Sequence, residues 1–307
     1  MVQFGQRQGE LLIAEISEVF AKGSISETRD RHVVFVCGGP RDGEPRSLRS
    51  RFLEWAGAHL PSVVVLSAED AYNEASSTEP LRLINISDFE NLLGDVSDCI
   101  LVFPESAGSY AEIGFFSKTS AKVRNKVLVA TPRAYFNRDS FINLGPVEFI
   151  NHKRSRFSPA IPVSDTELEI DFQAIASRIT DRLRHRKYRK KLSRGRFARM
   201  NFSEKLMVVL AMVMLFRATT IDGLEHTVRK IFEAASKVHI GHALSILIAA
   251  GWVKKTGDYY VPLSSATSIL EYDDVRPFTS VAVLNARVAY YHQKNDPEAY
   301  SCLSEIR

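Results

Sequence analysis

Short apolar runs alternate with amphipathic stretches along the first half of the chain. The apolar runs predict buried strands, and they occupy His32–Cys37, Val63–Leu66, Cys99–Phe103 and Lys126–Ala130. Patterns typical of helices precede and separate them, at Glu10–Phe20, Ser47–His59, Ser87–Leu93 and Ala111–Lys118. A strand, a helix and a further strand cross over right-handedly into a parallel sheet. We therefore predict an α/β domain with a doubly wound parallel sheet over residues 1–165.

The last third of the chain has a different, more helical pattern. Three stretches with helical spacing of apolar residues cover Ser203–Phe216, Ile221–Ala235 and Ser236–Ala250. Gly251 ends the third, and Trp252–Pro262 predicts two short strands that meet at a Gly-Asp turn. Three helices and a β-hairpin make a winged helix-turn-helix, which we expect over residues 201–307.

This module offers basic groups to a partner. Its third helix would present Lys237, His239 and His242 outward, and its hairpin would present Lys254 and Lys255. Such groups suit phosphate or a nucleic-acid groove. The same scaffold also binds proteins, so a nucleic-acid interface and a protein interface remain alternatives.

Composition adds few constraints. The 307 residues are 45% hydrophobic and 25% charged, which is typical of a globular protein long enough for two domains. No apolar run approaches the roughly 20 residues that span a bilayer, and the first residues lack a signal-peptide pattern, so we expect a cytoplasmic protein without membrane contact. Three scattered cysteines fit neither a disulfide framework nor a zinc site, and no metal is expected.

The charge is concentrated in one segment. Between Arg178 and Arg199 stand eleven Lys or Arg against one acid, a local charge of +10, so the rest of a chain with net charge +4 carries −6. This density exceeds what a solvated helix face needs and suits phosphates. Aromatic residues are few there, which favours backbone contacts over base stacking. We expect a basic helical linker at 166–200 that binds nucleic acid through Arg186, Lys187, Lys190 and Lys191, with plain solvation as the alternative.

The strand Cys99–Phe103 leads into the most informative segment. Pro104–Ser109 has turn chemistry, and a helix that opens at Tyr110 would place Glu112 in its first turn. Free N–H groups and the helix dipole there would hold the carboxylate ionised. Such a carboxylate is suited to attack a sugar carbon; alternatively, it only compensates the dipole.

Candidate ligand contacts follow the strands. Cys37, Gly38 and Gly39 end the first strand of the predicted sheet, and ligands bind beyond the carboxyl ends of parallel strands. The spacing differs from GxGxxG, so a tight turn is the alternative. Asn143 lies after the last predicted strand and is suited to a ribose hydroxyl or base edge, in its own or a neighbouring subunit, or to a turn before Gly145.

Four blocks of the sequence resemble a known family. They contain Cys37–Gly39, Glu90–Asn91, Glu105–Gly114 and Ser140–Pro146. Together they resemble the nucleoside 2-deoxyribosyltransferase family and, more narrowly, the deoxyribosyltransferase-like effectors of retron anti-phage systems. The resemblance implies that Glu112 is the covalent nucleophile on the anomeric carbon. The family has an Asp eight residues before the Asp that opens this strand; here Glu90 stands eight before Asp98, with a longer side chain, and would orient the sugar or handle a proton.

The resemblance also implies a function. It predicts a toxic effector that cleaves the N-glycosidic bond of a nucleotide, with NAD as the leading substrate, nicotinamide as the released base, and no retained cofactor. A reverse transcriptase and its RNA-linked branched DNA (msDNA) would restrain a homo-oligomer or larger assembly. The implied substrate contacts are Cys37, Gly38, Gly39, Asp98, Pro104, Ser106, Gly108, Ser109 and Asn143. The alternatives are a housekeeping deoxyribosyltransferase and a non-enzymatic, nucleotide-sensing regulator that binds DNA.

Overall fold

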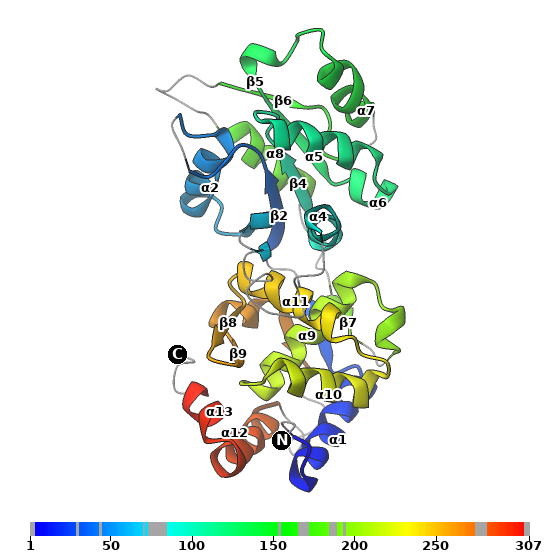
Figure 1. Cartoon of the computed structure of the whole chain (residues 1–307), viewed down its shortest axis with the longest axis vertical. Coiled ribbons are helices and arrows are strands. Elements are labelled where there is room, and N and C mark those ends of the chain that lie inside the picture. Colours follow the sequence, from blue (N-terminus) through cyan, green and yellow to red (C-terminus); the bar gives the residue numbers. More distant parts are fainter. Residues whose placement is uncertain are drawn as a thin grey trace. The chain divides into compact units, whose positions relative to one another are not determined.

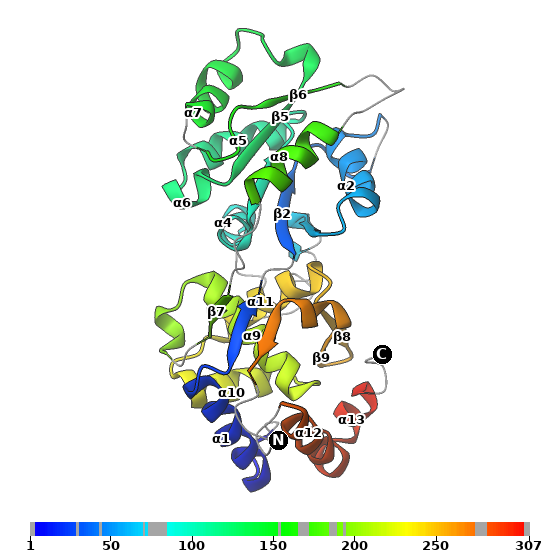
Figure 2. The same ribbon diagram turned by 180° about the vertical axis from the view of Figure 1, so that it is seen from behind.

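The chain forms two compact units (Figures 1 and 2). The α/β unit comprises Arg31–Glu69 and Asn85–Arg186, and the helical unit comprises Met1–Asp30, Asp70–Ile84 and Lys187–Arg307. The computed structural model describes residues 4–28, 31–42, 45–69, 71–72, 85–152, 155–164, 172–183, 189–192, 195–273 and 281–303.

The α/β unit is built on a five-stranded sheet of order β3-β2-β4-β5-β6 in which every described pair is parallel. Its strands are β2 (His32–Cys37), β3 (Val63–Leu66), β4 (Cys99–Val102), β5 (Val127–Pro132) and β6 (Ile161–Val163). Strands β4 and β5 are buried along their whole length, as expected of parallel strands covered on both faces. The predicted α/β class is confirmed.

Helices cover both faces of this sheet. Phe52 of α2 (Leu48–His59) and Ile175 of α8 (Gln173–Leu183) belong to one buried cluster with Leu101 of β4. On the other face, the ring of Phe116 in α5 (Ala107–Lys118) meets Phe35 of β2 edge to face, with centroids 6.1 Å apart. The remaining elements of this unit are α4 (Ile86–Val96), α6 (Ala121–Arg124), η2 (Arg133–Tyr135), η3 (Asn143–Val147) and α7 (Glu148–Asn151).

Helix α8 revises the predicted linker at 166–200. Its buried residues are Ile175, Ala176, Ile179 and Leu183. They recur at helical spacing and pack in the core of the α/β unit, so this part of the basic segment is structural. The chain from Lys187 onward belongs to the helical unit instead.

The helical unit combines segments from both ends of the chain. Its helices are α1 (Arg7–Ala21), α9 (Phe202–Phe216), α10 (Ile221–Phe232), α11 (Lys237–Ala249), α12 (Val281–Asn295) and α13 (Pro297–Leu303), with η4 (Phe197–Arg199) and η5 (Ser264–Ser268). A hairpin joins β8 (Val253–Thr256) to β9 (Tyr259–Pro262), as predicted. Strand β1 (Ile25–Thr28) pairs antiparallel with both β10 (Leu270–Tyr272) and β7 (Arg189–Lys191).

The N-terminal helix was expected in the α/β domain, but it packs in the helical unit. The ring of Phe20 in α1 meets Phe232 of α10 with centroids 4.9 Å apart, and Phe4 lies 4.3 Å from Phe216 of α9. Helix α1 and Phe4, which precedes it, are thus buried against helices from the other end of the sequence. The two units therefore differ from the predicted division at residue 165.

Among the described residues, no single helix has both the length and the apolar character to cross a membrane, although α10 and α11, bent by 115°, reach those limits as a pair.

Candidate active site

The candidate site lies at the carboxyl ends of β2 and β4. Strand β3, which follows β2 in the chain, pairs with one edge of β2, whereas β4 pairs with its other edge. Such a reversal of strand order opens a crevice beyond the strands, where ligands of α/β proteins bind. Cys37 ends β2 here, and Glu105 follows β4 after a buried Pro104.

The turn after β4 starts a helix earlier than predicted. Ser106 is the N-cap of α5, and its Oγ accepts a hydrogen bond from Ser109 N at 3.2 Å. Ser109 Oγ in turn accepts from the N–H groups of Glu105 and Ser106 at 3.0 and 2.9 Å. Two predicted substrate contacts thus form a capping box. Glu112 therefore lies in the second helical turn, and the prediction of a first-turn position is wrong.

Glu105 joins the two strand ends. Its carboxylate accepts hydrogen bonds from the backbone N–H groups of Gly39, Leu48 and Arg49 at 2.8, 2.6 and 3.0 Å. The positive end of helix α2 is thereby occupied by a side chain of the protein itself. A Cβ at Gly38 would approach Arg49 Cβ to 2.6 Å, which explains why this turn uses glycine.

Glu90 of α4 and Glu112 of α5 form the chemical centre of the site. Their side chains hydrogen-bond each other, which requires a proton on one of them. Glu90 is buried and Glu112 is half-buried. Burial, followed by the charge of Glu90, raises the pKa of Glu112 to about 8, and burial raises the pKa of Glu90 to about 7. The expectation that a helix terminus holds Glu112 ionised is therefore replaced by a pair that shares a proton.

Arg49 is a site residue that the sequence analysis did not identify. Its side chain is only 4% exposed, and both terminal nitrogens contact the carboxylate of Glu69 at 2.8 Å. Its charge lowers the pKa of Glu112 and of the Cys37 thiol, both of which burial raises. The one sequence signal was its place in the first turn of the helix that follows Gly38 and Gly39.

Asp98 lies at the amino ends of the strands, opposite the candidate site. It precedes β4, and its Oδ2 accepts a hydrogen bond from Val33 N at 3.0 Å near the start of β2. The carboxylate therefore joins the amino ends of two strands, whereas Cys37 and Glu105 follow the carboxyl ends. This position does not bring Asp98 to the candidate site.

The other predicted substrate contacts have various surroundings. Gly108 is exposed in the first turn of α5. Asn143 is exposed at the start of η3, where its Nδ2 donates to the carbonyl oxygens of Tyr135 and Arg138 at 2.7 and 2.8 Å. Both amide hydrogens of Asn143 thus hold the preceding turn. Its role toward a ligand stays a prediction.

The predicted nucleic-acid contacts lie in the helical unit or outside the described residues. Arg186 and Lys187 fall outside them. Lys190 and Lys191 are on β7, and Lys190 Nζ lies 2.7 Å from Glu204 Oε1. Lys254 and Lys255 are on β8, where Lys255 is exposed.

Helix α11 does not present its basic residues as predicted. His242 is buried, and this burial lowers its pKa to about 4. Lys237 forms an ion pair with Asp222 of α10. The prediction that the third helix offers these groups outward is wrong for His242, which α11 buries, whereas Lys237 and His239 are half-buried.

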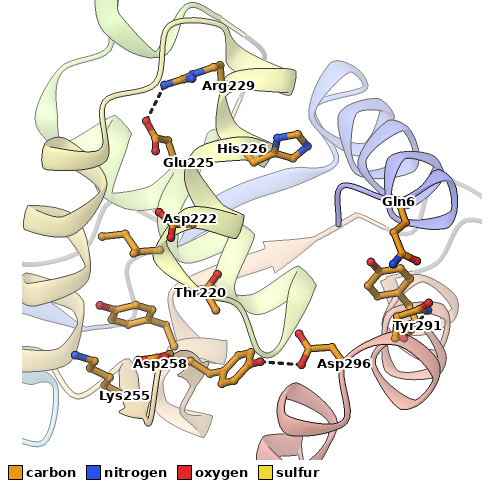
Figure 3. Close-up of a pocket in the computed structure, with 14 residues that line it drawn as sticks. Gln6, Thr220, Asp222, Glu225, His226, Arg229, Lys255, Asp258, Tyr291 and Asp296 are labelled. Atoms are coloured by element: carbon orange, nitrogen blue, oxygen red, sulfur yellow. Dashed lines mark hydrogen bonds and ion pairs between the residues drawn. The ribbon is translucent and has the colours of Figure 1, made fainter. Parts of the chain in front are cut away.

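The helical unit also contains an open cavity of about 960 Å³ (Figure 3). It is lined by the start of α10, the β8–β9 hairpin and the end of α12. Tyr259 Oη donates to Asp296 Oδ1 at 2.7 Å, and Arg229 lies 2.7 Å from Glu225. Glu225 and Arg229 pair with each other within the lining, whereas Asp222 pairs with Lys237 and His226 with Glu10 outside it. Within the described part of the chain, no group of three or more His, Cys, Asp or Glu is arranged to hold a metal ion.

Comparison with known proteins gives two kinds of similarity. A family model described as "STM3845 retron effector protein" matches residues 45–255. The chain is 31% identical over 121 residues to the "Retron Ec73 putative ribosyltransferase/DNA-binding protein" of Escherichia coli, covering 39% of this chain and 38% of that protein. It is 28% identical over 156 residues to the "Retron Ec86 putative ribosyltransferase/DNA-binding protein" of the same organism, covering 50% and 48%. The matched regions span less than half the length of these relatives.

Proposed function

The chain belongs to the STM3845 retron effector family, and from that premise we propose that it is a toxic effector that cleaves the N-glycosidic bond of a nucleotide. The observation that carries this proposal is the hydrogen-bonded pair of Glu90 and Glu112 beside the end of β2. Two carboxyl groups in one crevice are the usual equipment for substitution at an anomeric carbon. The ribosyltransferase names of the two relatives support the same chemistry.

Glu112 has the higher pKa of the pair and holds the shared proton at rest. In the proposed reaction this proton passes to Glu90, and Glu112 then attacks the anomeric carbon as its carboxylate. The bond from that carbon to the base nitrogen breaks, and the base leaves with the bonding electrons. A purine leaving group takes the proton carried by Glu90, whereas a cationic pyridinium base departs as a neutral molecule without one. Water then attacks the anomeric carbon of the glycosyl ester and releases the Glu112 carboxylate. The proton of that water passes to Glu90 when Glu90 has given its own proton to a purine, and to solvent when the base was a pyridinium.

NAD is the proposed leading substrate. Besides burial, the charges of Glu112, Glu90 and Glu69 raise the pKa of the Cys37 thiol, whereas the charge of Arg49 lowers it. An acidic crevice favours positive charge on the departing pyridinium and on the oxocarbenium-like sugar. Hydrolysis would release nicotinamide and deplete the NAD of an infected cell, and NAD would be consumed as a substrate.

We propose that the helical unit recognises the partners. Its helices α9, α10 and α11 are followed by the β8–β9 hairpin, which is the order of elements in a winged helix-turn-helix. Its basic strand β7 suits phosphates. The proposed partners are the retron reverse transcriptase and its msDNA, which would restrain the effector within a homo-oligomer or larger assembly. The DNA-binding part of both relatives' names supports a nucleic-acid partner.

Base release tests this proposal. The purified chain is incubated with NAD, nucleosides and nucleotides, and free base is measured by chromatography. We expect Glu112→Gln to lose at least about 10³-fold in kcat while keeping the fold, since the amide retains the shape but is not a nucleophile. The matched control is Glu54→Gln on the exposed side of α2, which should keep full activity.

Each other outcome contradicts part of the proposal. Full base release by a folded Glu112→Gln variant would exclude the proposed nucleophile. Release that requires an added acceptor base would indicate a deoxyribosyltransferase. Retention of a nucleotide by the wild-type chain without any release would indicate a nucleotide-sensing, DNA-binding regulator.

A further inference from the structure

Helix α11 begins without a cap from the described part of the chain. Its N-cap residue, Ser236, makes no side-chain hydrogen bond, and no acidic residue stands in the first turn. The N–H groups of Lys237, Val238 and His239 have no acceptor among the described residues. Unpaired N–H groups and the positive end of the helix dipole favour an anion at such a terminus.

Lys205 of α9 is a second, independent sign of a missing anion. Only 7% of this residue is exposed, and it forms no hydrogen bond or ion pair with a described residue. Its ammonium lies over the ring of Phe197, 5.6 Å from the centroid. Burial lowers the pKa of Lys205, and no neighbouring acid offsets this effect. Buried charges in folded proteins are nearly always paired, so this lysine is unusual.

Lys205 and the start of α11 lie close to each other. Helix α9 packs against α11. The charge of Lys205 lowers the pKa of His239, which stands in the first turn of α11, so the ammonium acts directly on that turn. A cation near the positive end of a helix is unfavourable by itself. Two basic side chains and a helix terminus of the same sign therefore meet at one place.

The acids of the neighbouring segments pair with other basic residues. These ion pairs are Asp222 with Lys237, Glu204 with Lys190, and Glu233 with Arg196. None of these acids pairs with Lys205 or His239 within the described part of the chain. An anion from outside the chain would supply the charge that this place lacks.

We propose that Lys205 and the first turn of α11 bind a phosphate group. Its oxygens accept from the N–H groups of the turn and from the Lys205 ammonium, and His239 provides a further donor. This site is separate from strand β7 and from the crevice that holds Glu112, so it goes beyond the proposed glycosidase reaction. A nucleic-acid backbone and a free phosphate compound share this chemistry, and the experiment has one arm for each.

Thermal melting of the full-length chain measures binding of inorganic pyrophosphate. We expect pyrophosphate, but not acetate at equal ionic strength, to raise the Tm of the wild type. Lys205→Met keeps the apolar stem and should weaken this response at least about 10-fold in apparent affinity. Without added anion its Tm should equal or exceed that of the wild type, because an unpaired buried charge is removed. Lys294→Met, an exposed lysine over the ring of Tyr290, is the matched control and should respond as the wild type does.

The second arm uses a duplex DNA oligonucleotide and fluorescence anisotropy over a salt series. We expect Lys205→Met to weaken binding about 10-fold and to make the salt slope shallower by about 1. Dependence on Lys205 with DNA alone assigns the phosphate to a nucleic-acid backbone, and dependence with pyrophosphate alone assigns it to a free compound. Unchanged binding of both probes by Lys205→Met would overturn the inference, while the glycosidase reaction and the role of β7 would stand. Equal stabilisation by acetate would overturn the choice of phosphate.

A variant with its own anion tests the helix terminus separately. Ser236→Asp places a carboxylate at the N-cap, so we expect a higher Tm without added anion and at least about 10-fold weaker binding of the probe that the wild type binds. Thr220→Asp is the matched control, because Thr220 already caps α10 by accepting from Gly223 N at 3.1 Å. Wild-type binding by Ser236→Asp would exclude the start of α11 from the site. If Lys205→Met fails to fold, the result with Ser236→Asp decides.

Discussion

The two carboxyl groups of the site act as one titrating unit. Glu90 and Glu112 hydrogen-bond each other. The negative charge left by the first proton is therefore stabilised by the hydrogen bond, whereas the second negative charge is repelled by the first. Mechanistically, this arrangement provides a carboxylate and a carboxylic acid in one crevice near neutral pH. The charge of Arg49 lowers the pKa of Glu112 and so favours the ionised form of the proposed nucleophile.

This pair predicts a pH dependence of stability. Both pKa values are raised from the ordinary 4.5, to about 7 for Glu90 and about 8 for Glu112. The folded chain therefore binds protons more tightly than the unfolded chain, and the resulting stabilisation is complete below about pH 4.5 and is lost as pH rises through about 7 to 8. We expect the difference in free energy of unfolding between wild type and Glu90→Gln/Glu112→Gln to change in that window.

Urea unfolding of both proteins from pH 5 to pH 9 measures this difference. The double variant provides the background slope from all other titrating groups. Wild-type stability should fall relative to the double variant as the pH rises. A constant difference over the range would show that the two carboxyl groups do not share a raised pKa.

At the scale of elements, Glu105 fixes how helix α2 meets strand β4. Its carboxylate receives three backbone N–H donors from the Gly39 turn and the first turn of α2. We expect Glu105→Ala to lower the free energy of unfolding by about 2–3 kcal/mol, because it removes charge-assisted hydrogen bonds and leaves part-buried donors unpaired. Urea denaturation measures the loss, and Glu54→Ala in the exposed pair with Arg46 should change stability by less than about 1 kcal/mol. Similar losses in both variants would contradict a special role for Glu105.

Strand β7 shows how the basic segment changes its meaning in the fold. Arg189 pairs with Glu271 and Asp273, and Lys190 pairs with Glu204, so acids from distant sequence offset part of the local charge. Further basic groups line a cavity of about 200 Å³ beside this strand, namely Lys191, Arg196 and Arg199. Described residues of the basic segment gather at this cavity.

Charge reversal tests the predicted nucleic-acid surface. We expect Lys191→Glu with Arg199→Glu to weaken nucleic-acid binding. The negative slope of log affinity against log salt should become shallower by about 1–2, because fewer phosphate contacts mean that fewer counterions are released on binding. Gel-shift assays over a salt series measure the slope. Lys294→Glu on the exposed side of α12 is the control. An unchanged slope in the double variant would indicate solvation or a protein partner for this segment.

At the scale of the whole molecule, the division into two units predicts which fragments fold. A fragment that ends at residue 165 lacks α8 and therefore exposes the core around Phe52 and Leu101. It also carries α1 and β1 without the helices and strands that bury them. We expect residues 1–165 to lack a cooperative thermal transition.

The matched fragment is residues 31–186, which keeps the whole α/β unit. We expect it to melt cooperatively, because α8 covers the sheet face that includes Leu101 and Leu128. Circular dichroism on heating and limited proteolysis compare the two fragments. Cooperative melting of 1–165 together with unfolding of 31–186 would contradict the observed division of the chain.

The local pattern of the sequence determined the main elements and their class. Strands at His32–Cys37 and Val63–Leu66 have the predicted bounds, and the hairpin around Gly257 forms as predicted. Apolar periodicity and turn residues are properties of neighbouring positions, so a sequence reveals them directly. The proposed importance of Glu112 came from a family resemblance and not from periodicity.

The tertiary structure decided which distant residues meet. Whether Glu112 is ionised depends on burial and on Glu90, which stands on another helix, and the functional setting of Arg49 depends on Glu69 and the Gly38 turn. The same holds for α1. Its sequence predicts an amphipathic helix, but its apolar face packs against α10, which comes from the other end of the chain. Local patterns fix what each segment can bury, whereas contacts across long sequence separations fix what it is buried against and therefore its charge state and chemistry.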